Sequence, residues 1–230
     1  MISKIETGEL KPGDQLPTER VLNERFNVQR ATVRQALDVL ESRGLIIRKR
    51  GSGTFVTKAK IEREAIRVFA FTKIMAASGY KTDAKILSIL GVEADARVAG
   101  KLKIEVDTPI YYYHRLRLLD GEPMMLEKIR LPKHIFPCMD QHDLENNSLF
   151  EVMEKEFGRE ITTAEQAIEA VGASDYEAEV LGVLPGAALM MEERISRDQF
   201  GTIIEFSRDL YRGDRFRFIV EDARFDIEIK

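Results

Sequence analysis

The chain has 230 residues, of which 44% are hydrophobic, and its formal net charge is −4 at pH 7. This length suits one large domain or two small ones, and no apolar run is long enough to cross a membrane. The first residues lack the apolar core of a secretory signal, and a single cysteine, Cys138, excludes an internal disulfide. With only three scattered histidines besides, we expect a cytoplasmic protein that carries no metal and no cofactor.

Charge is distributed unevenly along the chain. Residues 1–57 contain ten Lys or Arg and seven Asp or Glu, whereas the remaining 173 residues contain 25 basic and 32 acidic side chains. A basic segment attached to an acidic body is typical of a nucleic-acid-binding module, although ordinary surface variation produces similar differences.

The basic segment contains patterns for short helices. Thr18 is a good N-cap for a helix over 18–26, and a second helix over 30–43 has apolar residues at helical spacing and stops at Gly44. An earlier segment, 2–8, is expected to form the last turns of a preceding helix.

A hairpin follows the second helix, with strands over 45–49 and 54–56 and a basic, glycine-rich tip. Two helices and such a hairpin are the parts of a winged helix-turn-helix, whose second helix enters the major groove with its N-terminal end. On spacing alone, the same arginines equally fit a solvated helix face. The predicted DNA-binding residues are Arg20, Gln29, Arg30, Thr32, Arg34, Arg50 and Gly51, with Lys49 as a further phosphate contact.

Residues 10–56 resemble the DNA-binding domain of GntR-type bacterial transcriptional regulators. The resemblance rests on L-P-x-E-R from Leu16, R-x-T-V-R-x-A-L from Arg30 and G-x-G-T-F-V from Gly51. The family usually has a longer first helix, with more residues upstream of the position of Ile2. The resemblance implies that the positions that contact operator DNA are Arg20, Arg30, Thr32, Arg34 and Gly51.

The rest of the chain is expected to form a second domain. We predict a DNA-binding domain over 1–57, a charged linker over 58–69 and a domain over 70–230. Ser148 and Ser174 both begin S-x-x-E capping boxes, and a further helix is expected after Thr72. Strands joined largely by hairpins, with helices inserted, favour an α+β antiparallel domain. The predicted strands are 84–93, 98–105, 110–118, 124–131, 161–171, 188–197, 202–211 and 216–228.

One predicted strand, 110–118, carries two arginines on the same face. Because burying an unpaired charge is expensive, Arg115 and Arg117 require either an acidic ligand or an internal network with Glu127 or Glu205. Two alternatives also stand for Thr72 and Ser148, which lie at predicted helix N-termini: anion binding or plain N-capping. Alternation places Tyr111 and Tyr113 with the arginines and places Ile110, Tyr112, Leu116 and Leu118 on the other face.

Residues 70–230 resemble the UTRA effector-binding domain of the HutC branch of GntR-type regulators, whose fold is similar to chorismate lyase. The matching pieces are Phe71-Thr72 with Met75, Arg115 through Glu127, Ser148 to Phe150, and Glu205 through Tyr211. A two-residue loop at Asp120-Gly121 would place Glu127 opposite to the arginine face, and an odd loop, which the resemblance favours, would place it on that face. The predicted effector-binding residues are Phe71, Thr72, Met75, Arg115, Arg117, Glu127, Ser148, Phe150, Glu205 and Tyr211.

The resemblance implies a homodimer that binds double-stranded operator DNA and a small anionic effector, and does not bind a membrane. Because family branches with this arginine pair respond to sugar phosphates, we expect a repressor that such a metabolite releases from DNA. One rival is an enzyme, but the sequence contains no nucleophile–base pair, and fold alone does not carry function. A second rival is a DNA-binding protein without a ligand.

Overall fold

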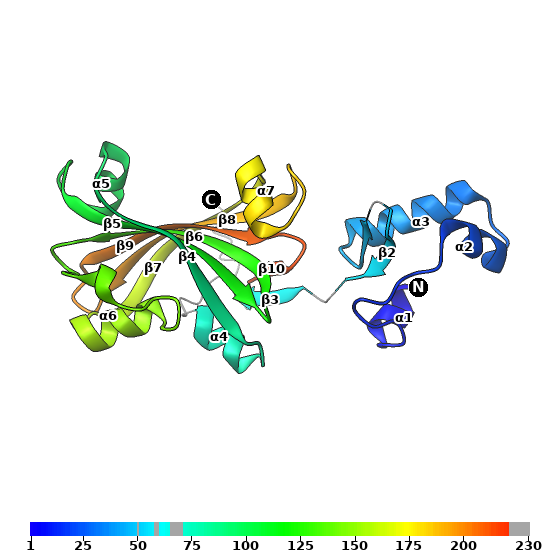
Figure 1. The fold of residues 1–230 in the computed structure, drawn as a ribbon, viewed down its shortest axis with the longest axis horizontal. Helices are drawn as coiled ribbons and strands as arrows, with labels where there is room; N and C mark the ends of the chain where they lie inside the picture. The colour runs from blue at the N-terminus through cyan, green and yellow to red at the C-terminus, as the bar shows by residue number, and fades with distance from the viewer. Residues whose placement is uncertain (50, 58–59, 65–70, 221–230) are drawn as a thin grey trace, which may run out of the picture. The chain divides into compact units, whose positions relative to one another are not determined.

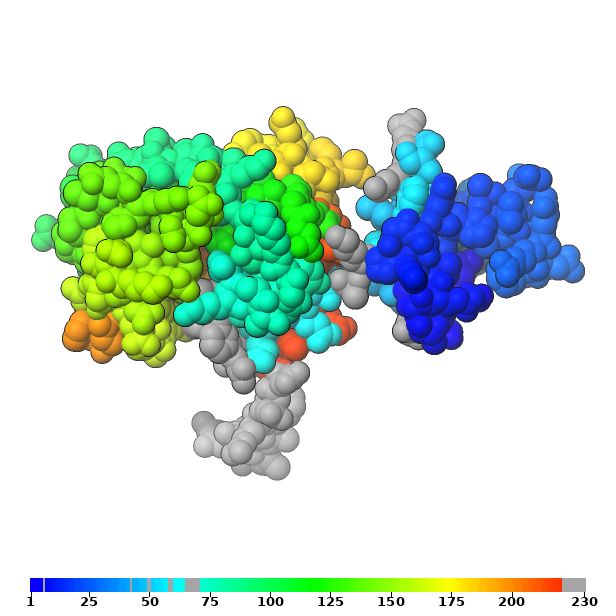
Figure 2. Space-filling model, turned by 60° about the horizontal axis from the view of Figure 1, so that its bottom comes forward, coloured from blue at the N-terminus to red at the C-terminus, as the bar shows by residue number. Residues whose placement is uncertain are grey.

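The structure, a computed structural model, describes residues 1–49, 51–57, 60–64 and 71–220, which are coloured along the chain in Figure 1 and in the space-filling view of Figure 2. The chain divides into two compact units. One contains residues 1–63 together with 214–217, and the other contains 64–213 with the described part of the segment from 218 onward. Arg50, a predicted DNA contact, lies outside the described residues.

The first unit has the elements of a winged helix-turn-helix. Helices α1 (Ile2–Glu6), α2 (Glu19–Phe26) and α3 (Arg30–Ser42) precede a hairpin of β1 (Ile46–Lys49) and β2 (Gly53–Val56). As predicted, the Thr18 side chain caps α2 by accepting a hydrogen bond from the amide of Val21. Apolar side chains from all these parts share one core, which contains Leu16, Leu22, Val33, Leu37, Leu40, Ile46 and Val56.

The second unit is built on an antiparallel sheet with the strand order β4-β5-β6-β9-β8-β7. Its strands are β4 (Thr82–Glu93), β5 (Pro109–Leu119), β6 (Glu122–Pro132), β7 (Ile161–Gly172), β8 (Ala188–Asp198) and β9 (Ile203–Arg212). The six corresponding strand predictions are confirmed to within two residues at each end. The expected α+β antiparallel fold is therefore confirmed.

Helices cover both faces of this sheet (Figure 1). On one face lie α4 (Phe71–Ala77) and α6 (Leu149–Phe157), and α6 packs on Tyr113 of β5. On the other lie α5 (Ala96–Leu102) and α7 (Asp175–Leu181), and α7 packs on Leu116. The predicted alternation along β5 is thus correct. A short 3-10 helix, Met139–Gln141, precedes α6.

The predicted strand over 98–105 is wrong, because this segment contains α5. Asp95 begins the helix, accepting a hydrogen bond from the amide of Val98 at 2.7 Å. Val98, Ala99 and Leu102 are buried together on one side of the helix. Their spacing of one and four residues is helical, and the capping aspartate determines the outcome.

The segment expected to be only a linker, 58–69, contains strand β3 (Ile61–Glu64), which pairs with β10 (Phe216–Ile219). Its residues carry charge without glycine or proline, and the sequence alone does not reveal a partner that lies about 150 residues later. The predicted strand over 216–228 is described only as β10, because residues 221–230 lie outside the described part. Among the described residues, no helix combines the length and apolar character needed to cross a bilayer.

Candidate DNA interface and effector site

The N-terminal end of α3 presents polar side chains to solvent. Gln29, Arg30, Thr32 and Arg34 are all exposed. Gln29 occupies the N-cap position, but its side chain makes no capping hydrogen bond to the helix. The side-chain amide of Gln29 is therefore available to hydrogen-bond a base edge or a phosphate.

Two of the predicted arginines have only weak partners within this unit. Arg34 reaches Glu19 at 3.3 Å and Arg20 reaches Glu24 at 3.1 Å, and all four side chains are at least one-third exposed. Exposed ion pairs of this kind contribute about 0–1 kcal/mol, so a DNA phosphate can replace the carboxylate at small cost.

The wing is anchored to α3 by a cation that the sequence analysis did not single out. Arg48 of β1 lies 2.6 Å from Asp38 and 3.5 Å from Glu41. At the tip, Gly51 has a φ of +77° and open space around it, which allows the backbone to approach another molecule closely. The Lys49 side chain, a predicted phosphate contact, lies outside the described atoms.

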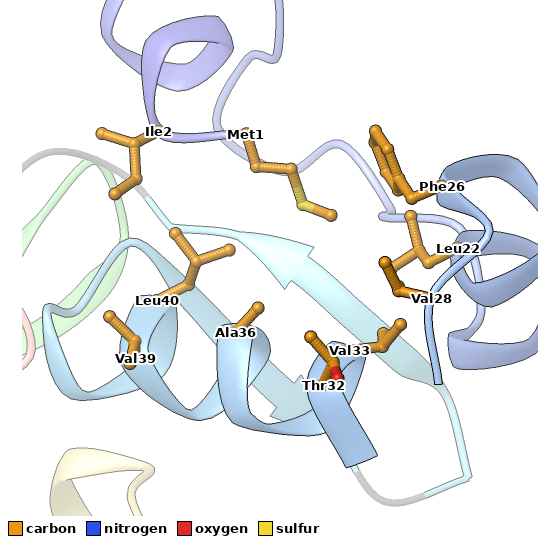
Figure 3. A pocket seen from close by; sticks show the side chains of 10 residues that line it. All are labelled: Met1, Ile2, Leu22, Phe26, Val28, Thr32, Val33, Ala36, Val39 and Leu40. Carbon is orange, nitrogen blue, oxygen red and sulfur yellow. The ribbon is translucent and has the colours of Figure 1, made fainter. Parts of the chain in front are cut away.

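An apolar groove of about 420 Å³ runs along α3, from Thr32 to Leu40 (Figure 3). Thr32, predicted to contact DNA, lines this groove. Because the groove contains no charged side chain, it does not suit an anionic effector. Its lining residues are Met1, Ile2, Leu22, Phe26, Val28, Thr32, Val33, Ala36, Val39 and Leu40.

In the second unit, Glu127 lies directly opposite Arg115 on the neighbouring strand. The loop between β5 and β6 is the two-residue turn Asp120-Gly121, so the expectation of an odd loop is wrong. The orientation expected for Glu127 is nevertheless restored within β6. The pairing of β6 with β5 shifts by one residue between Arg117 and Leu118, so β6 contains one extra residue there. This β-bulge turns Glu127 to the arginine face, as the resemblance had implied.

The arginine pair is buried and engaged from several elements. Arg115 is 2% exposed, and its Nε donates to Oε2 of Glu127 at 2.8 Å. Arg117 is 5% exposed, and its Nη2 donates to the Thr72 hydroxyl on α4 at 2.8 Å. Its guanidinium also lies over the ring of Phe71, 4.9 Å from the ring centroid. Arg117 thus joins the sheet to α4.

A third buried cation, Arg194 of β8, lies on the same face. Its guanidinium contacts Glu205 at 2.8 Å and Asp209 at 3.4 Å, and lies 5.5 Å from the centroid of the Phe150 ring on α6. Tyr211 belongs to this group, since its hydroxyl donates to Glu192 at 3.0 Å.

Three side chains in this cluster, Glu192, Arg194 and Asp209, were missed by the sequence analysis. The available signal was the period of two in β8, where Glu192, Arg194, Ser196 and Asp198 alternate with other residues. Charges that alternate along a predicted strand indicate a buried polar face when the strand lies inside a sheet.

The cluster contains three guanidinium groups and four carboxylates, and Asp209 carries the least favourable charge. Burial raises its pKa most, and the carboxylates of Glu127, Glu192 and Glu205 add to the effect against the opposing influence of Arg194, giving a pKa of about 8. Near neutral pH the protonated Asp209 leaves three positive charges facing three negative ones. For Glu127, burial is outweighed by Arg115, Arg117 and Arg194, so its pKa is lowered.

Two buried atoms in this cluster make no hydrogen bond to any residue in the described ranges. They are Nε of Arg117 and Oδ1 of Asp209. Buried polar atoms are normally satisfied, so these two atoms are candidates for contacts with a polar ligand.

The remaining predicted effector residues come from the helices. Met75 of α4 is 1% exposed and has the burial of a core residue. Ser148 is the N-cap residue of α6, yet it makes no side-chain capping bond, whereas Ser174 caps α7 with the full capping box. The backbone amides at the start of α6 therefore remain without the hydroxyl that normally satisfies them.

Comparison with known proteins shows which family domains the two units match. The family model described as bacterial regulatory proteins, gntR family, matches residues 2–56, and the UTRA domain model matches residues 77–217. The HTH-type transcriptional repressor NagR of Bacillus subtilis is 31% identical over 217 residues, covering 94% of this chain and 89% of that protein. The probable fructoselysine utilization operon transcriptional repressor of Escherichia coli is 27% identical, covering 97% and 92%.

Among solved structures, PhnF from Mycobacterium smegmatis superposes with a TM-score of 0.70 at 29% identity, and 94% of each chain is covered. The resemblance to the HutC branch is thus confirmed across both units, and the enzyme alternative is excluded because the family consists of regulators. The chain therefore belongs to the gntR family of bacterial transcriptional regulators, with a winged helix-turn-helix followed by a UTRA domain.

Proposed function

We propose that this protein is a repressor that leaves its operator when a small anionic metabolite, such as a sugar phosphate, binds to the second unit. The observation that carries the proposal is the burial of Arg115 and Arg117 on the face that α4 and α6 cover. A buried guanidinium group requires an anion, and the Nε atom of Arg117 has no acceptor among the described residues.

The anionic group would bind between Arg117, Thr72 and the start of α6 at Ser148. Uncapped backbone amides at a helix N-terminus attract anions, and α6 lacks the capping bond of its serine. The carboxylates of Glu127 and Glu205 would accept hydrogen bonds from hydroxyl groups of the same ligand. The name of one relative, a probable repressor of a fructoselysine utilization operon, fits metabolite control but does not identify the ligand.

For DNA binding we propose Arg30 and Arg34 as base-contacting residues, with Arg20, Gln29, Thr32 and the wing at Arg50 and Gly51 as further contacts. A homodimer would present two α3 helices to the half-sites of a palindromic operator. The two DNA-binding units of the dimer would have two alternative spacings. The effector would act by binding more tightly to the dimer in one spacing than in the other.

The effector is tested by measuring the Tm of the protein with added compounds. Glucose 6-phosphate is compared with glucose, and phosphoenolpyruvate and inorganic phosphate serve as smaller anions. A ligand that binds only the folded state raises Tm, and binding at 100 times its Kd stabilises the protein by about 2.7 kcal/mol. We expect at least one phosphorylated compound to raise Tm, and its unphosphorylated counterpart to have no effect. If no anion in the panel moves Tm, the effector half of the proposal fails.

The release step is tested on an operator selected from random DNA by the purified protein. The compound that raises Tm should lower the affinity for this DNA at constant salt. An effector that tightens DNA binding would contradict release, while leaving the effector site intact.

A further inference from the structure

Strand register brings three carboxylates together in one row on the face that carries Arg115 and Arg117. Glu127 of β6 lies directly opposite Asp209 of β9, and Asp209 in turn lies directly opposite Glu192 of β8. All three side chains are at most 5% exposed. Like charges at directly opposed positions of a sheet are destabilising, so this row lowers the stability of the fold and favours a partner of opposite charge.

The short ion pairs among these buried groups do not include Asp209. Arg115 contacts Glu127 at 2.6 Å, whereas Asp209 contacts Arg194 through Oδ2 at 3.4 Å. Two nitrogens of Arg194 already donate to Glu205. The other oxygen of Asp209, Oδ1, has no hydrogen-bond partner among the described residues. Asp209 therefore offers a buried acceptor to a donor from outside the chain.

The positive counterpart lies two strands away, at Arg117. Its contact with Glu127 is 3.8 Å long, and it also contacts the neutral hydroxyl of Thr72 and the ring of Phe71. Its Nε has no hydrogen-bond partner in the described ranges either. Because only β6 separates β5 from β9, the backbones of these two strands are roughly 10 Å apart, and a small metabolite can bridge the side chains. The face thus has a cationic end at Arg117 and an anionic end at Asp209.

We propose that the effector carries a primary ammonium group besides its anionic group, and that the ammonium group binds at Asp209. An ammonium group supplies three donors and one positive charge, which matches an unsatisfied acceptor beside two further carboxylates. A hydroxyl group in its place supplies one donor and no charge, so it would not balance the charge of the row. This inference rests on the anionic effector of the proposed function and specifies its class, a zwitterion.

The protonation state of Asp209 in the free protein fits this assignment. The charged groups that act on it are Glu127 from β6, Glu192 and Arg194 from β8, and Glu205 from its own strand. Burial raises the pKa of Asp209 most, and the carboxylates add to the effect, giving a pKa of about 8. At pH 7 the free side chain is therefore protonated, and an ammonium group beside it would favour the ionised form. Binding should then release the proton of Asp209.

Two pairs of probes test the ammonium group, and each pair differs by the exchange of one hydroxyl group for an ammonium group. They are glucose 6-phosphate with glucosamine 6-phosphate, and 3-phosphoglycerate with O-phosphoserine. In at least one pair, titration calorimetry at pH 7 on the full chain should show at least about 10-fold tighter binding of the ammonium compound. The same titrations in two buffers with different enthalpies of ionisation should show about one more proton released by the wild type than by Asp209→Asn.

Variants test the position of the ammonium group. Asp209→Asn should reduce the preference for the ammonium compound to less than about threefold, because the charged acceptor is lost. Asp209→Ser gives the same comparison if the asparagine variant does not unfold cooperatively. The control variant, Glu165→Gln, removes one carboxylate from an exposed side chain of β7 and should keep the full preference.

The outcomes separate this inference from the proposed function. If no anionic compound raises Tm, the effector half of the proposed function fails and this inference fails with it. If anionic compounds bind but an ammonium group improves the binding of none, only this inference is overturned. A preference that survives in both Asp209 variants would overturn the placement of the ammonium group at Asp209.

Discussion

Arg115 and Glu127 face each other across β5 and β6 with Nε 2.8 Å from Oε2, and this contact depends on one additional residue in β6. The turn at Asp120-Gly121 alone would direct Glu127 to the opposite side of the sheet. The bulge reverses that orientation, so a local irregularity of the backbone determines the electrostatics of the candidate effector site.

Removal of one partner of this pair should destabilise the protein strongly. Arg115→Ala would remove the closest cation from the buried Glu127, and the nearest remaining ion-pair contact, with Arg117, is 3.8 Å long. The loss of one partner from a buried ion pair costs about 3–5 kcal/mol. Urea unfolding of the wild type and the variant measures this difference. The double variant Arg115→Met with Glu127→Met should recover most of the loss, and a double variant as unstable as Arg115→Ala would contradict the account.

The two predicted functions should separate in single variants. Arg34→Ala removes a guanidinium group that we propose contacts a base, so operator affinity should fall by about 1–3 kcal/mol, whereas the effector-induced rise in Tm should persist. Arg117→Ala should remove the rise in Tm and leave DNA affinity close to that of the wild type. Fluorescence anisotropy and thermal unfolding give the two readouts. If either variant loses both activities equally, the separation of the two sites is wrong.

Two serines with the same local motif should respond differently to substitution. Ser174→Ala removes a complete capping box and should cost about 0.5–2 kcal/mol, without affecting effector binding. Ser148→Ala removes no capping bond, so it should cost much less stability. If Ser148 contacts the effector, that variant should weaken its binding at least about fivefold, as titration calorimetry would report. The reverse assignment of the two effects would contradict the proposed anion position.

Asp209 should make stability depend on pH. Its folded pKa of about 8 lies above the ordinary value of 3.8, so between these values the folded chain holds a proton that the unfolded chain has released. The contribution of Asp209 therefore decreases as pH rises through this range, which follows from linkage.

Asp209→Asn removes this dependence while keeping the shape of the side chain. Relative to the wild type, the variant should gain at least about 1 kcal/mol between about pH 5 and about pH 8, which corresponds to about 2–4 °C in Tm for a protein of this size. Thermal unfolding of both proteins across this range is the measurement. A difference in Tm that is constant with pH would show that Asp209 does not titrate there.

Most of the secondary structure could be predicted because its signals are local. Thr18 and Gly44 mark helix ends whatever the rest of the chain does, and alternation along β5 separates Tyr113 from Leu116 without knowledge of the neighbouring strands. The same reasoning failed for α5, where Asp95 was not recognised as a cap, and for β3, whose partner β10 is distant in sequence.

The candidate effector site was predicted only in part, since its chemistry depends on strand order. Arg115, Arg117 and Glu127 belong to adjacent strands joined by a short hairpin, and the sequence pointed to them. Arg194 and Asp209 also belong to this cluster, but they were missed. They reach the site because β9 pairs with β6 on one side and with β8 on the other. No pattern among neighbouring residues in the sequence predicts this strand order.

By itself, the sequence determined most of the segments that become helices and strands, and its motifs identified a DNA-binding module followed by an effector-binding domain. Periodicity and capping act within a few residues, so they can be read from a single chain. Only the tertiary structure decided which carboxylate faces which guanidinium group and which serine caps its helix. These outcomes depend on strand pairing, a bulge and burial, because each joins residues that are far apart along the chain.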